Sequence, residues 1–178
     1  MEYLKIKNDL NISSLIIGNN FDYQLNLKQL IEPKKKISFQ LLFRMTRDGD
    51  DFKKFHELCD NQGPTVTLFQ LEDNNILGFF TPLNWNTSSN WISDPRMFHF
   101  SLNKNIKSMK SKNNQRGMFC HPSYGPCSDF FMIWNGVTMK KPCIDPFAQS
   151  YDNCENLYPG KQKDRYNCLE LEVFKIIN

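Results

Sequence analysis

The sequence predicts an α+β domain in which an antiparallel β-sandwich carries a few short helices. Short runs of β-branched and aromatic residues recur along the chain and are separated by polar turns. Only one stretch shows a clear helical spacing of its apolar residues. The chain has 178 residues, 40% of them hydrophobic, and 15 phenylalanines, and no Pro-, Ser- or Gly-rich linker divides it. We therefore expect a single domain over residues 1–178 that is large enough to bury a substantial hydrophobic core.

The pattern of strand, turn and helix is clearest in the first half of the chain. The apolar run 39–45 has the length of a strand, and the following "RDGD" predicts a turn in which Asp48 or Asp50 caps a helix. Gly63 and Pro64, in "DNQGP", are expected to prevent that helix from continuing. Between the RDGD turn and Gly63, four residues at spacing i, i+3, i+4 and i+7 predict one buried face of a helix: Phe52, Phe55, His56 and Cys59.

The remaining apolar runs predict the strands of the sandwich. "TVTLFQL" and "ILGFFT", joined by the polar residues 72–75, predict a β-hairpin. Further strands are expected at "MFHFSL" (97–102), "GMFC" (117–120), "FFMIW" (130–134) and "CLELEVFKII" (168–177). In the last run, the alternation of apolar residues with Glu170 and Glu172 shifts at Phe174. This shift indicates a bulge or a change to burial on both faces.

The net charge and the lengths of the apolar runs indicate which class of protein this is. The 22 basic and 19 acidic residues give a net charge of +3, which is too small to indicate nucleic-acid binding by itself. No apolar run is long enough for a secretory signal or a membrane span. We therefore expect a cytoplasmic protein without a transmembrane segment.

The cysteines are expected to be free thiols, because the predicted compartment is reducing. No two of them are spaced as in a zinc ribbon or a thioredoxin motif, and no phosphate-binding glycine loop is present, so we expect no metal and no cofactor. A metal site could recruit His56, His99 or His121 together with scattered cysteines, but zinc sites usually show paired local ligands. Three thiols lie in polar, turn-rich sequence and are expected to be accessible: Cys127, Cys143 and Cys154.

The stretch "CHPSYGP" (120–126) has the most reactive-looking composition in the chain. Neighbouring residues of an extended chain point to opposite faces, so the side chains of Cys120 and His121 are expected to diverge. Pro122 restricts His121 further. We therefore interpret this stretch as a strand ending in a rigid turn, and we expect no catalytic residues and no enzymatic activity. The alternative is a thiol-based redox enzyme or sensor that uses surface cysteines, with Cys120, Cys127 and Cys154 as candidates.

A second candidate feature is the basic segment 101–117, which has no acidic residue. Its basic residues are Lys104, Lys107, Lys110, Lys112 and Arg116. Such a run is most simply a solvated loop, although it could attract an acidic partner, an anionic membrane or RNA. The adjacent Phe98, Phe100 and Phe119 are expected to alternate like core residues and not to form an exposed stacking platform. Binding of nucleic acid is thus the third hypothesis and the least favoured one.

Taken together, these segments resemble the TLDc (TBC/LysM-associated) domain family over residues 12–177. The resemblance rests on "LLFRMTRDGDDFKKFHELCDNQGPTVTLFQLEDNNILGFFTPLNW", "ISDPRMFHFSL", "FCHPSYGP" and "LELEVFKII". The sequence departs from the family pattern in three places, one of which is "SYDNCENLYPG", which only loosely resembles the family's Gly/Ser/Cys-containing loop. Phe79 stands at the second glycine of the hairpin, and "CSDFFMIW" replaces a glycine-rich run after the HPSYGP motif. Cys154 falls close to a cysteine that some members carry.

The resemblance implies a sandwich of two antiparallel sheets flanked by short helices, with no agreed catalytic activity. Members of the family are linked to oxidative-stress resistance and to binding of the vacuolar proton-pumping ATPase (V-ATPase), whose assembly the domain can regulate. We therefore expect a non-enzymatic interaction domain, cytoplasmic or held at endomembranes through a protein partner such as V-ATPase subunits. The loops expected to bind that partner contain Arg47, Asp48, Gly49, Asp60, Gly63, Pro64, His121, Pro122, Ser123, Tyr124 and Gly125.

Overall fold

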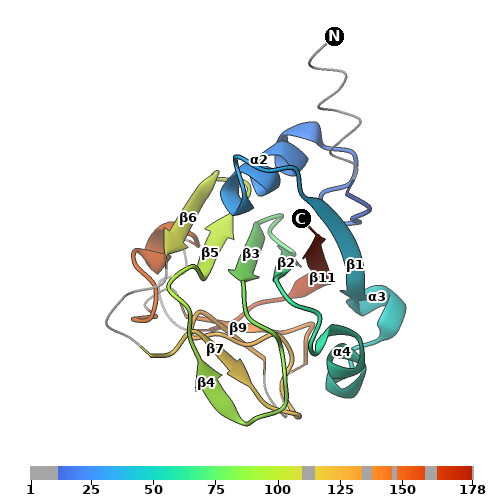
Figure 1. The fold of residues 1–178 in the computed structure, drawn as a ribbon, viewed down its shortest axis with the longest axis vertical. Coiled ribbons are helices and arrows are strands. Elements are labelled where there is room, and N and C mark those ends of the chain that lie inside the picture. Colours follow the sequence, from blue (N-terminus) through green and yellow to red (C-terminus); the bar gives the residue numbers. More distant parts are fainter. Residues whose placement is uncertain (1–11, 110–114, 134–137, 146–147, 159–163, 178) are drawn as a thin grey trace.

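A computed structural model describes residues 12–109, 115–133, 138–145, 148–158 and 164–177 (Figure 1). Its helices are α2 (Phe21–Ile31), α3 (Met45–Asp48) and α4 (Phe52–Cys59), with a 3-10 turn at Cys154–Asn156. The longer strands are β1 (Ser38–Arg44), β2 (Thr65–Leu71), β3 (Ile76–Thr81), β5 (Phe98–Ser101), β6 (Ile106–Met109) and β11 (Cys168–Ile177). The shorter ones are β4 (Asn90–Ile92), β7 (Met118–Cys120), β8 (Phe131–Met132), β9 (Cys143–Ile144) and β10 (Asp164–Arg165).

A six-stranded antiparallel sheet in the order β1-β11-β2-β3-β5-β6 organises the fold. The second layer consists of two smaller antiparallel sheets, β10-β9-β8 and β4-β7. The predicted class, antiparallel sheets in layers with a few short helices, is therefore confirmed. The hairpin predicted around residues 72–75 is also present, as β2 and β3.

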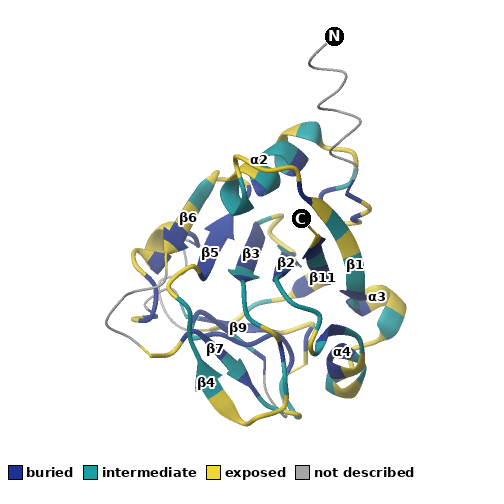
Figure 2. Cartoon of the chain, in the orientation of Figure 1, coloured by how far each residue is buried: buried dark blue, intermediate teal, exposed yellow. Residues whose placement is uncertain are grey.

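The large sheet has a separate apolar core on each face. On one face, Leu27 of α2 and Ile16 pack with Phe100 and Phe174. On the other, α4 and the two small sheets cover Phe69, whose ring stacks on Phe131 at a centroid distance of 4.2 Å. Figure 2 shows that the central strands of the large sheet are mostly buried (dark blue), whereas β1, at its edge, is largely intermediate or exposed (teal and yellow).

The turn after β1 differs in detail from the prediction. Met45 begins the short helix α3 and does not extend the strand, and the cap of α4 is Asp51, whose side chain accepts a hydrogen bond from the Lys53 amide at 2.9 Å. Asp48 accepts from the Arg44 amide at 2.8 Å, and Asp50 accepts from the Met139 amide at 2.7 Å. The nearby aspartates therefore hold backbone groups of other segments, which sequence spacing does not reveal.

The glutamates of β11 are buried, although they alternate with apolar residues. Glu170 and Glu172 are 5% and 0% exposed, whereas Leu169 is 52% exposed. The register shift opposite β2 lies between Cys168 and Glu170, and a second shift lies in β1, between Leu41 and Phe43. β11 thus has both a bulge and a stretch buried on both faces, but they lie between Cys168 and Phe174, before the point at which the sequence pattern shifts.

Candidate partner-binding surface

His56, near the end of α4, joins this helix to the loop of the HPSYGP motif. Its Nδ1 lies 2.8 Å from Oδ1 of Asp60, and its Nε2 lies 2.9 Å from the His121 carbonyl and 3.0 Å from the Tyr124 carbonyl. Carbonyl oxygens only accept hydrogen bonds, so Nε2 is the donor. The residue is 9% exposed, so its predicted place on the buried face of the helix is confirmed. Residues far apart in the sequence are thereby fixed to one another.

The HPSYG loop itself is tightly hydrogen-bonded. The Tyr124 amide donates to the His121 carbonyl at 3.0 Å, and the Gly125 amide donates to the Ile133 carbonyl at 3.1 Å. Cys120 is fully buried in the core, whereas His121 is half-buried on the opposite side of the strand. The predicted divergence of these two side chains is confirmed. The motif is a rigid turn that presents side chains outward.

An aromatic row covers the outer face of the β4–β7 sheet, and it consists of Trp91, Phe119, His121 and Tyr124, all half-buried. Phe119 pairs with Trp91 across the ladder, and its ring centroid is 5.1 Å from those of Trp91 and Tyr124. The Phe119 and His121 rings are nearly parallel, at 12° and 5.9 Å. The Arg116 guanidinium lies 5.5 Å from the Trp91 ring centre at one end of the row.

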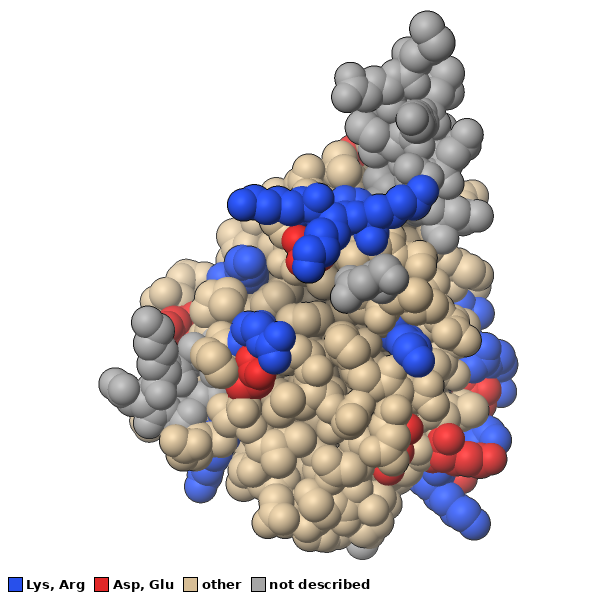
Figure 3. Space-filling view, in the orientation of Figure 1, with Lys and Arg blue, Asp and Glu red and all other residues tan. Residues whose placement is uncertain are grey.

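Phe119 is thus not the core residue that the sequence suggested, although Phe98 and Phe100 are buried as expected. Alternation along β7 sends its neighbours Met118 and Cys120 into the core, so Phe119 faces outward. Trp91 belongs to a three-residue strand that sequence reasoning missed. The available signal was the pair Trp91–Ile92 between a Ser- and Asn-rich turn and Asp94. In Figure 3 the surface over β4 and β7 is largely free of charge.

The other expected binding residues lie close to α4 but mostly bind backbone groups. Arg47 Nη2 lies 2.7 Å from Asp48 and donates to the Leu42 carbonyl at 2.9 Å. Burial alone would raise the pKa of Asp48, but hydrogen bonds from Arg47 and from the Arg44 amide outweigh burial and lower it. These contacts fix the corner that precedes α4.

Behind α4, the turn at Gly63 has a φ of 84°, which favours glycine, and its amide donates to Asn84 Oδ1 at 2.7 Å. The Pro64 carbonyl accepts from the Ile176 amide at 2.9 Å. Of the expected residues, His56 thus brings Asp60 together with His121 and Tyr124. The contacts of Gly63 and Pro64 are those of a structural turn.

A comparison with protein-family models identifies the family of this chain. The model of the TLDc domain family matches residues 10–177, nearly the whole chain. The chain belongs to the TLDc domain family. A search of curated proteins returned no match.

Within this TLDc domain, the first glycine of the hairpin has a clear steric reason. A Cβ at Gly78 would lie 2.1 Å from the ring of Phe100 on the neighbouring strand, so a larger residue would displace that ring. Phe79, which replaces the second glycine, fills the core instead. Its ring stacks on His99 at 4.7 Å and is 2% exposed.

The cysteines of the TLDc domain are all buried, so the expectation that Cys127, Cys143 and Cys154 are accessible is wrong. Their exposed fractions are 3%, 5% and 1%, because the second layer folds their turns against the large sheet. Burial raises the pKa of Cys120 to about 11 and that of Cys154 to about 12. These two thiols are therefore protonated at neutral pH.

The basic segment is only partly described, since Lys110 and Lys112 lie outside the described residues. Lys104 donates to the Asn156 carbonyl at 2.8 Å, and Lys107 lies 4.9 Å from the centre of the Phe98 ring. These two lysines are thus held against the domain, while Arg116 belongs to the end of the aromatic row.

A buried serine–histidine pair escaped the sequence reasoning. Ser128 Oγ lies 2.8 Å from Nε2 of His99, but His99 is 0% exposed and its Nδ1 has no hydrogen-bond partner among the described residues. Burial lowers the pKa of His99, so the ring is neutral. Without a carboxylate on Nδ1 and without access to substrate, the pair lacks the arrangement of a catalytic triad.

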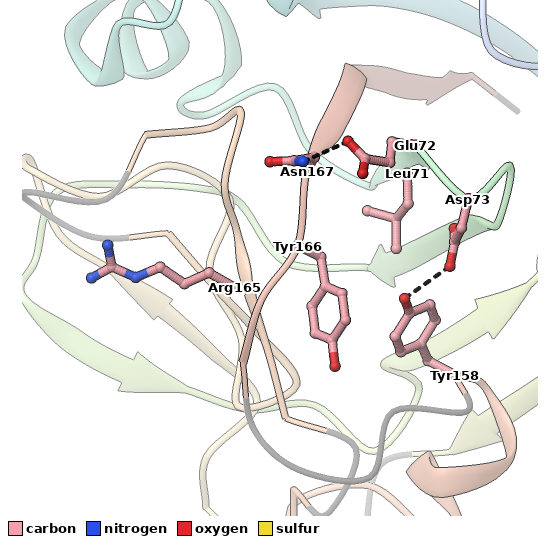
Figure 4. Close-up of a pocket in the computed structure, with 7 residues that line it drawn as sticks. All are labelled: Leu71, Glu72, Asp73, Tyr158, Arg165, Tyr166 and Asn167. Atoms are coloured by element: carbon pink, nitrogen blue, oxygen red, sulfur yellow. Dashed lines mark hydrogen bonds between the residues drawn. The ribbon is translucent and has the colours of Figure 1, made fainter.

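A groove of about 200 Å³ lies where the β2–β3 turn meets the start of β11 (Figure 4). Tyr158 donates to Asp73 at 2.9 Å, and Asn167 donates to Glu72. The polar groups that line the groove therefore largely bind one another. In the described part of the chain, no group of three or more His, Cys, Asp or Glu side chains is placed to hold a metal ion. No helix there is long and apolar enough to cross a membrane.

Proposed function

We propose that this TLDc domain is a non-enzymatic protein-interaction domain whose partner is the V-ATPase, and that this interaction contributes to oxidative-stress resistance. The proposal places the domain in the cytoplasm, at endomembranes when it is bound to the pump. It rests on family membership together with one structural observation. The aromatic row lies on an outer sheet face beside the loop that His56 fixes.

The chemistry of the aromatic row suits a protein partner. Trp, Tyr and Arg carry much of the binding energy in protein interfaces, and the row contains Trp91 and Tyr124 with Arg116 at its end. The rings are held at fixed distances by the β4–β7 ladder, so little side-chain freedom is lost on binding. A rigid, largely uncharged face of this kind favours a partner with an apolar contact surface.

The two alternative functions have less support. A redox enzyme or sensor requires an accessible thiol with a lowered pKa, whereas the described cysteines are buried and the pKa values of Cys120 and Cys154 are raised. Nucleic-acid binding would use the rings of the aromatic row as a stacking platform, together with the basic segment. However, Lys104 and Lys107 already contact the domain, and the face over β4 and β7 is largely uncharged.

Affinity capture from solubilised endomembranes, followed by mass spectrometry, tests the proposal. The wild-type domain is expected to recover V-ATPase subunits, and the double variant Trp91→Thr, Phe119→Thr is expected to recover much less. Threonine retains a high preference for strands and removes the rings. Leu169→Ser is a matched control, because Leu169 is an exposed apolar residue of β11, outside the row. Failure of the wild-type domain to recover any pump subunit would contradict the proposed partner.

A further inference from the structure

We propose that the outer edge of β1 is a second binding site, which takes an extended acidic segment of a partner protein as an added strand. This site lies on the large sheet and is separate from the aromatic row. Its existence does not depend on the identity of the partner that binds the row.

The hydrogen-bond pattern of the sheet shows which backbone groups of β1 point outward. The Ile176 amide donates to the Pro64 carbonyl on the β2 side of β11. The backbone groups of Ile176 therefore face away from β1, and Phe39, its partner in the ladder, forms a non-hydrogen-bonded pair with it. Leu41 lies two residues farther along β1 and forms the same kind of non-hydrogen-bonded pair with Phe174. The N–H and C=O groups of Phe39 and Leu41 thus point to the open side of β1.

Among the described residues, no segment pairs with this edge, and β1 is the last strand of the sheet on that side. Farther along β1, side chains cover the outer edge, because Arg47 donates to the Leu42 carbonyl and Asp48 accepts from the Arg44 amide. The opposite edge of the sheet differs, since Met109 of β6 accepts from the Asp152 amide at 2.9 Å. Residues 38–41 therefore present the more open edge.

This part of β1 lacks the usual devices that protect an edge strand. Residues 38–41, "SFQL", contain neither a charge nor a proline, and the bulge comes only after Leu41. Phe39 and Leu41 anchor the strand by packing against the core on the α2 face. An added strand would therefore meet a fixed and preformed template.

The charge next to this edge selects an acidic occupant. Lys34, Lys35 and Lys36 are exposed immediately before β1, and Figure 3 shows basic side chains gathered at the top of the molecule, over the connection from α2 to β1. Lys35 is 4.0 Å from Glu32, an acidic residue in the same connection. At about 3.3 Å per residue, a strand paired with residues 38–41 brings its overhanging end beside these lysines after a further one to four residues. Carboxylates at that end would be stabilised by the lysines.

A second copy of this chain fits the edge less well. If two β1 edges paired antiparallel, the lysine run of each copy would approach the end of β1 at which Arg44 is paired with Glu172 and Arg47 with Asp48 in the other. Charges that are already paired attract the lysines less than a run of carboxylates does. The occupant we infer is therefore an acidic strand of another protein.

The probe for this site is a short fluorescein-labelled peptide in which valine and threonine alternate and one end carries glutamates. A peptide with lysines in place of the glutamates is its control. We expect the acidic peptide to bind and the basic one not to bind. The variant Lys34→Glu, Lys36→Glu is expected to weaken binding roughly tenfold, whereas Lys140→Glu, Lys141→Glu, with the same change in net charge at another exposed site, leaves it unchanged.

Amide hydrogen exchange locates the bound peptide. In the free domain, the outward amides of Phe39 and Leu41 exchange fast while that of Gln40, which pairs with Lys175, is protected. The acidic peptide is expected to slow exchange at Phe39 and Leu41 and to leave Trp91 unchanged. Absence of binding, equal binding of the basic peptide, or binding without protection of Phe39 and Leu41 would overturn the proposal. Concentration-dependent dimerisation that protects these amides without any peptide would instead assign the edge to a second copy and equally overturn it.

Discussion

Trp91 and Phe119 face each other across the β4–β7 ladder, with ring centroids 5.1 Å apart, on the side of this small sheet that points away from the core. The inner side of the same sheet supplies Met118 and Cys120 to the core, and both are 0% exposed. This small two-stranded sheet thus packs against the core with one face and presents aromatic rings on the other. The packing that stabilises the fold also positions the candidate binding surface.

Replacing His56 by alanine is expected to loosen the junction between α4 and the HPSYG loop. The change removes hydrogen bonds to Asp60 and to the carbonyls of His121 and Tyr124, at a cost of about 2 kcal/mol in the free energy of unfolding. Chemical denaturation measures this cost, and hydrogen exchange of the Tyr124 amide should become faster. Lys53→Ala, an exposed change on the same helix, is the control. Equal stability of the two variants would show that His56 does not hold the loop.

Removal of the Glu172 carboxylate is expected to be among the most destabilising single changes. Glu172 is 0% exposed and accepts hydrogen bonds from Arg44 Nε at 2.7 Å and from the Leu15 amide at 2.9 Å. Glu172→Ala leaves these donors without their acceptor and should cost about 3–5 kcal/mol. Glu57→Ala is a suitable comparison, because its exposed pair with Lys54 should contribute less than about 1 kcal/mol.

Acid should destabilise the domain through its paired aspartates. The hydrogen bond from Arg96 lowers the pKa of Asp94, and the net effect of the contacts of Asp48 also lowers its pKa below the ordinary value of 3.8. The folded-state pKa is then below the unfolded-state value, so the stabilisation is complete above about pH 4 and is lost as the pH falls through the folded-state pKa.

Thermal unfolding measured from pH 6 to pH 2 tests this expectation. The wild-type midpoint should fall across the acidic part of the range, and Asp48→Asn combined with Asp94→Asn should reduce the slope. A variant with the same slope as the wild type would assign the acid sensitivity to other groups.

The thiols should be unreactive in the folded domain. Burial raises the pKa of Cys120 to about 11 and that of Cys154 to about 12, and both side chains are at most 1% exposed. Alkylation by iodoacetamide at pH 7.5 should therefore be slow until denaturant is added. Fast modification of Cys120, Cys127 or Cys154 in the native state, located by mass spectrometry, would revive the redox hypothesis.

Local patterns predicted much of the fold. The helical spacing from Phe52 to Cys59 correctly placed Phe55, His56 and Cys59 on a buried face, and the opposite directions of Cys120 and His121 followed from strand geometry. Each of these predictions concerns side chains on one continuous segment. Their relative directions are fixed by the backbone of that segment alone.

The predictions that failed concern which distant segment covers a given face of a strand or turn. The alternation of side chains along β7 showed that Phe119 lies on the opposite face from Met118 and Cys120. It did not show which of the two faces would point away from the core. Similarly, Cys127 and Cys154 lie in polar sequence and are buried by distant strands, while Glu172 is buried because Arg44 and the residues around Ser14 supply its partners. Sequence spacing carries no information about such remote partners.

The proposal that the aromatic row binds the V-ATPase can be tested by the affinity of the purified domain for the purified pump, measured by biolayer interferometry. We expect Trp91→Thr, Phe119→Thr to weaken binding at least about 30-fold, since two interface aromatics should each contribute 1 kcal/mol or more. Leu169→Ser should bind as the wild type does, and all three proteins should show similar thermal midpoints. Undiminished affinity of the folded double variant, or no measurable binding by the wild type, would contradict the proposal.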